Sequence, residues 1–152
     1  IADDAVTAAK ATGFGKIAQA QTTVTTTTSS TSSTSFTDVT NLTVNITPSA
    51  SDSKILIMLG VIIRVMSQSS EGNVSDFQVL RDSTSITQFR LGNREANNEQ
   101  RDIHTSGYHI LDSPSTTSQV TYKLQMKKVN GDQVQINDGS KQSHITVLEL
   151  LA

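Results

Sequence analysis

The stretch Ile55-Leu-Ile-Met-Leu-Gly-Val-Ile-Ile63 decides the fold of this chain, because it is apolar at almost every position. It is far shorter than the roughly 20 residues that a membrane span needs, and its content of Ile and Val favours a β-strand. Successive side chains of a strand point to opposite faces, so both faces of this strand are apolar. One face can fill the core of a β-sandwich, whereas the other face, with Leu56, Met58 and Ile62, also needs a cover.

The segment Ile145-Thr-Val-Leu-Glu-Leu-Leu151 has the same two-faced character near the end of the chain. Either a loop of the same chain or another subunit could cover the second face of these strands. We favour a subunit, because an open apolar strand is prone to aggregate. The predicted subunit interface consists of Leu56, Met58, Ile62, Leu148 and Leu150.

Glu149 interrupts the apolar pattern of this last strand. The simpler interpretation places Glu149 at the rim of the interface, with its carboxylate in water. The alternative is an ion pair between chains, for instance with Arg64 or Lys54.

The rest of the chain from residue 15 onward shows the two-residue period of strands. Residues 42–46 and 120–126 alternate cleanly between apolar and polar side chains, as expected for strands with one buried face. A hairpin is predicted around Arg81–Thr84. Asn130-Gly131 predicts a tight turn that joins a strand over 119–129 to a short strand near 134–136. Residues 22–37, almost all Ser and Thr, predict two polar edge strands with a Ser-rich turn between them.

Many short strands at this spacing, without any long helical period, predict an all-β, jelly-roll-like antiparallel β-sandwich over residues 15–152. Residues 1–14 are Ala-rich and predict a stem or linker segment, which could form a short helix. Because the chain starts without Met, we expect it to be the C-terminal part of a longer protein.

Composition excludes several classes of function. The formal net charge of −2 supplies no basic excess for nucleic acid or for insertion at an anionic membrane. The chain has no cysteine, so disulfides and thiolate metal sites are impossible. No catalytic or metal-binding motif is present, so we expect neither an enzyme nor a cofactor. His104 and His109 lie five residues apart and would face opposite sides of a straight strand. A metal ion on a symmetry axis, held by one histidine from each of several chains, remains open.

A polar binding loop is the remaining kind of site that the sequence offers. The candidate receptor-binding loop comprises Asn93, Arg94, Glu95, Asn97, Asn98, Glu99 and Arg101, and the segment 67–73 is a second candidate. Loops carried by a rigid sandwich often bind partners, although a plain solvated loop explains this composition too. Few aromatic residues are available, which disfavours a stacking site for carbohydrate.

Several short segments resemble the C-terminal domains of tail-fibre and other virion-surface proteins of bacteriophages. They are Gly15-Lys-Ile17, Ser35-Phe-Thr-Asp38, Ile46-Thr-Pro-Ser49, Ser53-Lys-Ile-Leu56, Ser118–Leu124 and Ser143–Glu149. The Ala, Val, Thr and Lys of residues 1–10 also resemble the repeats that precede such domains in fibre stems. The resemblance implies a jelly-roll-like sandwich, a homotrimer and the absence of a cofactor.

The resemblance also implies a function, namely a virion structural protein at the tip of a fibre or appendage of a bacterial virus. We expect it at the virion surface, where it would join other virion proteins through the N-terminal segment and attach to a glycan or protein of the host surface. The alternatives are a purely structural capsid decoration, head-fibre or turret protein, and a subunit of a non-viral extracellular filament. A glycan-degrading enzyme is a weaker alternative, since chance alone brings some carboxylates close together.

Overall fold

The computed structural model describes residues 16–66, 73–93, 101–137 and 141–151, and within these ranges the chain forms ten β-strands. None of the described segments forms a helix that is long and apolar enough to cross a membrane. The predicted stem of residues 1–14 lies outside the described residues. The strands are β1 (Ile17–Thr25), β2 (Ser29–Thr31), β3 (Thr37–Ile46), β4 (Lys54–Met66), β5 (Asn73–Arg81), β6 (Thr84–Asn93), β7 (Arg101–Asp112), β8 (Val120–Asn130), β9 (Gln133–Ile136) and β10 (Ser143–Leu150).

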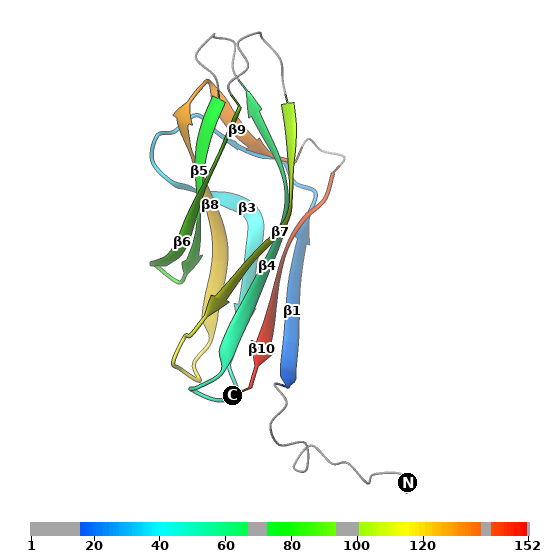
Figure 1. Cartoon of the computed structure of the whole chain (residues 1–152), viewed down its shortest axis with the longest axis vertical. Coiled ribbons are helices and arrows are strands. Elements are labelled where there is room, and N and C mark those ends of the chain that lie inside the picture. Colours follow the sequence, from blue (N-terminus) through cyan, green and yellow to red (C-terminus); the bar gives the residue numbers. More distant parts are fainter. Residues whose placement is uncertain (1–15, 67–72, 94–100, 138–140, 152) are drawn as a thin grey trace, which may run out of the picture.

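The strands form two antiparallel sheets that pack face to face (Figure 1). One sheet has the order β1-β10-β4-β7, with β9 and β2 extending it beyond the ends of β10 and β1. The other sheet has the order β3-β8-β5-β6. The chain crosses repeatedly from one sheet to the other, which is the jelly-roll arrangement. The predicted all-β sandwich is therefore confirmed.

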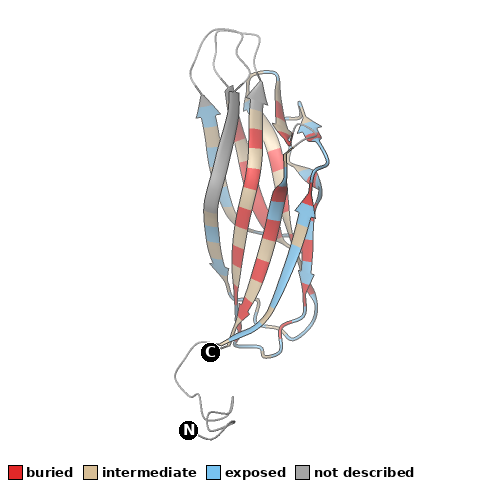
Figure 2. Ribbon diagram, turned by 90° about the vertical axis from the view of Figure 1, so that its right-hand side faces the viewer, coloured by how far each residue is buried: buried red, intermediate tan, exposed pale blue. Residues whose placement is uncertain are grey.

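The core lies between the sheets, and strict alternation along the strands builds it. In β4 the odd-numbered side chains from Ile55 to Ile63 are buried, whereas the even-numbered ones are half-buried. The opposite sheet contributes Phe77, Tyr122 and Leu124, which are also fully buried. Figure 2 shows this alternation as bands along the strands. Only one of the two apolar faces of β4 is thus used by the chain's own core.

Two of the predicted turns have different outcomes. The hairpin around residues 81–84 is confirmed, because β5 pairs with β6 directly through the turn at Asp82, whose φ is 54°. The chain also turns at Gly131, whose φ is 86°. The predicted tight turn and the short strand after it are thus confirmed, but β8 and β9 do not form a hairpin, because they belong to different sheets and β9 pairs with β4 and β2. A turn signal shows where the chain reverses and does not specify which strand becomes the partner.

The Ser/Thr-rich segment forms two edge strands, as predicted, with one difference of detail. β1 and β2 both lie at the edge of their sheet, but the turn between them contains Thr26–Thr28. The Ser-rich residues 32–35 follow β2 and lead into β3. Threonine is abundant on both sides of the break, so composition alone could not locate the turn.

Asn137 fills a break in the larger sheet, where β9 and β10 follow one another along the same edge of β4. Its Nδ2 donates to the carbonyl oxygens of Thr25 (3.1 Å) and Thr27 (3.2 Å), and its Oδ1 accepts from Ser143 Oγ (2.7 Å). Ser143 Oγ in turn accepts a hydrogen bond from the backbone N–H of Ile62 (3.0 Å). The φ of Asn137 is 57°, a left-handed conformation that asparagine tolerates. The interrupted strands are thus joined by side-chain hydrogen bonds.

Candidate assembly surface

An apolar row crosses the outer face of the sheet β1-β10-β4-β7. Register pairs Ala20 with Leu148, Leu148 with Leu56, and Leu56 with Leu111. Directly paired residues point to the same face and lie about 5 Å apart, so these four side chains form one continuous strip. Leu111 is 60 % exposed, and the others are half-buried or exposed. No part of the chain that the structure describes buries this strip completely.

The rows on either side are mixed and add apolar residues beside polar ones. Met58 lies next to the strip and pairs with Thr146 and His109. At the end of the sheet nearer to residue 17, Ile17 pairs with Leu150, and Ile17 is 61 % exposed. We call the surface of Ile17, Ala20, Leu56, Met58, Leu111, Leu148 and Leu150 the apolar face.

The predicted interface residues therefore lie together in part. Leu56, Met58, Leu148 and Leu150 all belong to the apolar face, and each is half-buried. Ile62 points to the same side of β4 but lies further along the strand, beyond Gly60. Whether another subunit covers these residues stays a prediction.

Gly60 interrupts the apolar side of β4 for a steric reason. The imidazole of His144, the register partner of Gly60 on β10, lies over the glycine. A Cβ at position 60 would lie 2.2 Å from Cε1 of His144, which is far inside van der Waals contact. The glycine thus makes room for an exposed histidine ring against the sheet.

The outer face of the other sheet has the opposite character. Register there aligns Asp38, Gln125, Gln78 and Gln88 in one row across β3, β8, β5 and β6. Each amide donates to the next side chain: Gln125 to Asp38 (2.5 Å), Gln78 to Gln125 (2.6 Å) and Gln88 to Gln78 (3.2 Å). We call this row the polar ladder. Its polar groups satisfy one another and need no partner protein.

An ion-pair network lies beside the polar ladder. Asp76 accepts hydrogen bonds from Arg90 Nε (2.6 Å) and Arg90 Nη2 (3.0 Å), and Lys127 Nζ lies 3.5 Å away. The hydrogen bonds from Arg90 are the main cause that lowers the pKa of Asp76. Lys127 also lies over the ring of Phe36, 4.7 Å from its centroid. One outer face of the sandwich is therefore charged and the other apolar.

The structure contradicts both predictions for Glu149, namely a rim position in water and an ion pair between chains. It is fully buried and points to the core side of β10, so it is neither a rim residue nor a partner of another chain. Its Oε1 accepts from Ser49 N, Ser49 Oγ and Ser53 Oγ, and its Oε2 accepts from Gln19 Nε2, each at 2.7 Å. Burial alone would raise the pKa of Glu149, but these hydrogen bonds outweigh burial and lower the pKa to about 2.

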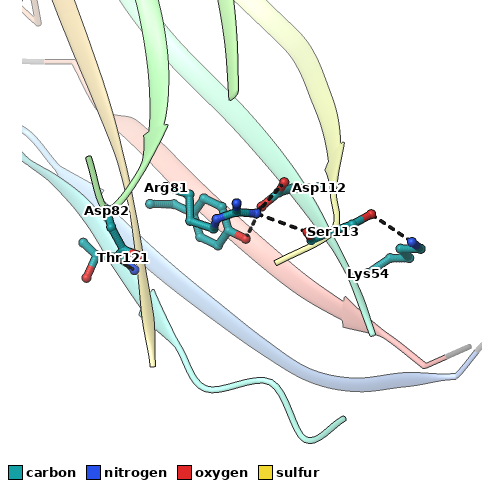
Figure 3. Close-up of polar contacts among 7 residues, drawn as sticks. Lys54, Arg81, Asp82, Asp112, Ser113 and Thr121 are labelled. Atoms are coloured by element: carbon teal, nitrogen blue, oxygen red, sulfur yellow. Dashed lines mark hydrogen bonds and ion pairs between the residues drawn. The ribbon is translucent and has the colours of Figure 1, made fainter. Parts of the chain in front are cut away.

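A second polar cluster, which is partly buried, lies at the same end of the sandwich (Figure 3). Arg81 Nη1 donates to both carboxylate oxygens of Asp112 (2.9 and 2.8 Å) and to the carbonyl of Ser113 (3.3 Å). Tyr122 donates its hydroxyl to Asp112 Oδ2 at 2.7 Å. Burial, followed by this hydrogen bond, raises the pKa of Tyr122. Arg81 and Tyr122 belong to one sheet and Asp112 to the other, so the cluster ties the sheets together.

The predicted receptor-binding loop falls largely outside the described residues. Residues 94–100 are not described, and of Asn93 and Arg101 only the backbone pairing is known. Asn93 pairs with Asn73, and Arg101 pairs with Val65. The strand ends that flank both candidate loops thus lie at one end of the sandwich, opposite the end where β1 begins (Figure 1).

The prediction that His104 and His109 face opposite sides assumed a straight strand, and β7 is irregular between them. The register partners of these residues are Ile62 and Met58, which lie on the same side of β4. An irregularity in the pairing leaves Gly107 as an extra residue of β7, so the strict alternation of a straight strand does not apply. Among the described residues, no three side chains of metal-binding type gather into a site.

Comparison with known proteins gives distant likenesses of structure only. No family of known proteins and no curated protein matches the sequence. Among solved structures, Eiger TNF from S. frugiperda is 13 % identical with a TM-score of 0.46, covering 88 % of this chain and 92 % of the other. The VP2 subviral particle of infectious bursal disease virus is 12 % identical with a TM-score of 0.45, covering 88 % of this chain and 38 % of the other. The structure of the Gt strain of the same virus is 12 % identical with a TM-score of 0.43, covering 90 % and 39 %.

All three TM-scores are below 0.5, so these likenesses carry no argument about this chain. The chain spans well under half the length of the virus chains that it matches. Identities this low show the fold alone and assign no function.

Proposed function

We propose that this chain is a non-catalytic structural module that assembles with copies of itself, as the sandwich end of a fibre or appendage on a bacterial virus. The observation that carries the proposal is the contrast between the two outer faces. The polar ladder is internally satisfied and suited to water, whereas the apolar face places several large side chains side by side, and the described residues leave them half-buried or exposed. Contiguous exposed apolar surface of this kind marks protein contact sites.

The free energy gained by burying the apolar face supports assembly. Fully burying an exposed Leu, Ile or Met side chain contributes roughly 1.5–3 kcal/mol. Leu111 and Ile17 are each about 60 % exposed. The half-buried Leu56, Leu148 and Met58 belong to the same face. Burying this face between copies would therefore yield several kcal/mol of apolar stabilisation, against the entropy cost of association.

The position of the chain ends supports a role at a tip. β1 begins beside the C-terminal end of β10, since Ile17 pairs with Leu150. The strand ends that flank the two candidate loops lie at the opposite end of the sandwich. A stem that enters at residue 16 would thus present those loops away from the particle. The segments that resemble phage fibre domains favour a virion, and the resemblance implies three copies.

The first test is the mass of the purified chain by analytical ultracentrifugation at micromolar concentration. A trimer is expected, and a monomer would contradict assembly through the apolar face. The attachment role is tested by adsorption of the protein to host cells, which Arg94→Ala or Arg101→Ala should weaken. A trimer that shows no affinity for cells and is seen on the capsid by microscopy would instead indicate a purely structural decoration protein.

A further inference from the structure

The side of the sandwich between β6 and β7 carries a second uncovered apolar surface. β6 is the edge of one sheet and β7 the edge of the other, and the two strands do not pair. Apolar residues near this side pack against the core but remain partly exposed: Ile86, Phe89, Leu91, Tyr108 and Ile110. On the opposite side β1 lies against β3, and the inward residues of β3 are fully buried: Val39, Leu42, Val44 and Ile46. The sandwich is therefore closed on one side and open on the other.

Aromatic rings dominate this open side. Phe77 in the core stacks on Phe89 with ring centroids 5.2 Å apart, and Phe89 contacts Tyr108 with centroids 4.3 Å apart. The hydroxyl of Tyr108 lies 3.4 Å from Thr87 Oγ1. The ring stack thus runs from the core to the surface and is held in place by its own chain. Partly exposed aromatic rings held rigidly in this way are typical anchors of protein interfaces.

The two apolar surfaces meet along β7. Within Tyr108–Asp112 the side chains alternate, so Tyr108 and Ile110 face the open side, whereas His109 and Leu111 lie on the outer face with Met58 and Leu56. The two apolar surfaces therefore meet along residues 108–112 of β7, and we call this line of residues the ridge. We call the half-buried residues of the open side the aromatic edge.

We propose that copies of this chain assemble head to tail, so that the aromatic edge of one copy packs against the apolar face of the next and β7 lies nearest the symmetry axis. The inference rests on the proposed function, from which the number of three copies is taken. A two-fold contact pairs the same patch on both copies and would cover the apolar face while leaving the aromatic edge open. A closed head-to-tail ring of three copies covers both the apolar face and the aromatic edge of every copy.

The chemistry of the two surfaces matches this arrangement. The floor of the apolar face is formed by Leu56, Met58 and Leu148, which offer aliphatic carbon and a thioether to incoming rings. Contacts between sulfur and aromatic rings are favourable and tolerate imperfect shape. The polar ladder lies on the sheet β3-β8-β5-β6, so it remains on the outside of such a ring and in water.

The first experiment places a charge at the ridge and compares it with a charge elsewhere. Leu111→Arg should lower the association constant by roughly 100-fold or more, because three like charges would meet near the axis. Val129→Arg is the matched control, since Val129 is also an exposed apolar residue, at 41 %, and lies outside both surfaces. Sedimentation velocity should show a monomer for the first variant and a trimer for the control. An unchanged trimer for Leu111→Arg would overturn the inference.

The second experiment distinguishes a head-to-tail ring from a two-fold contact. The chain has no cysteine, so Thr87→Cys on the aromatic edge and Thr146→Cys beside the apolar face can each be introduced cleanly. After treatment with a short bismaleimide, the double variant should give covalent dimers and trimers, and neither single variant should cross-link. Cross-linking of Thr146→Cys alone, or none in the double variant, would reject the ring while leaving assembly intact. A monomeric wild-type chain would instead reject the proposed function itself.

Discussion

Glu149→Gln is the most informative single substitution, because it removes the buried charge and keeps the size of the side chain. In the folded protein the pKa of Glu149 is lowered from 4.5 to about 2 by donors on Gln19, Ser49 and Ser53. At about 1.4 kcal/mol for each pKa unit, this difference corresponds to roughly 3 kcal/mol of stability in the ionised state. We therefore expect Glu149→Gln to lower the free energy of unfolding by about 3 kcal/mol near neutral pH.

The pH dependence gives the sign of the effect. A folded-state pKa below the unfolded value means that the unfolded chain binds more protons between the two values. The contribution of Glu149 is therefore complete above pH 4.5 and is lost as the pH falls through about 2. The difference in stability between the wild type and Glu149→Gln should shrink from about 3 kcal/mol to less than about 1 kcal/mol across this window.

Urea denaturation at a series of pH values measures this difference. Protein concentration must be held constant, because assembly makes apparent stability depend on it. Asp52→Asn, which changes an exposed carboxylate in the same loop as Ser49 and Ser53, is the matched control and should change stability by less than about 0.5 kcal/mol. A gap between wild type and Glu149→Gln that stays constant with pH, or is absent at neutral pH, would refute the reasoning.

Three further predictions concern stability, each measured by thermal or urea unfolding. Asn137→Ala should lower the free energy of unfolding by about 2–4 kcal/mol, because two backbone carbonyls and a serine hydroxyl lose a buried partner. Alanine also disfavours the φ of 57° at this position. A loss under about 0.5 kcal/mol would contradict the proposal that Asn137 joins the interrupted strands. Gly60→Ala should lower the free energy of unfolding by on the order of 1 kcal/mol, because the new methyl group displaces the ring of His144. Adding His144→Ala should recover this stability, whereas a loss caused by the backbone at residue 60 would persist. Asp112→Ala should cost about 1–3 kcal/mol, since it leaves the half-buried Arg81 guanidinium without its carboxylate. The double variant with Arg81→Met should be less destabilised than Asp112→Ala, and equal losses would refute the pairing.

The sequence by itself indicated most of the strands, though not β7, and the direction in which most of their side chains point. Burial alternates with a period of two along β4 and β10, so Leu56, Met58, Leu148 and Leu150 could be assigned to the outer face before any sheet was known. The hairpin at residues 81–84 was equally local, because its turn lies between two strands that pair directly. Local patterns suffice where neighbours in the chain are also neighbours in space.

Strand partners and buried polar contacts were decided only by the tertiary structure. Glu149 looked like an exposed interruption, yet its donors Gln19 and Ser49 lie about a hundred or more residues away in the chain. The polar ladder likewise depends on the register of four strands. Only β5 and β6 follow one another in the chain, whereas β3 and β8 are connected to them through β4 and β7 of the other sheet. The extra residue at Gly107 interrupts the straight strand that the histidine argument assumed.

The physical reason is that side-chain direction follows from the backbone of one strand, whereas a hydrogen bond needs two atoms whose positions depend on the whole topology. A pattern of apolar residues reports which surface must leave water. It does not report which distant donor will meet a buried carboxylate, because that meeting depends on the register and crossing of every strand between them.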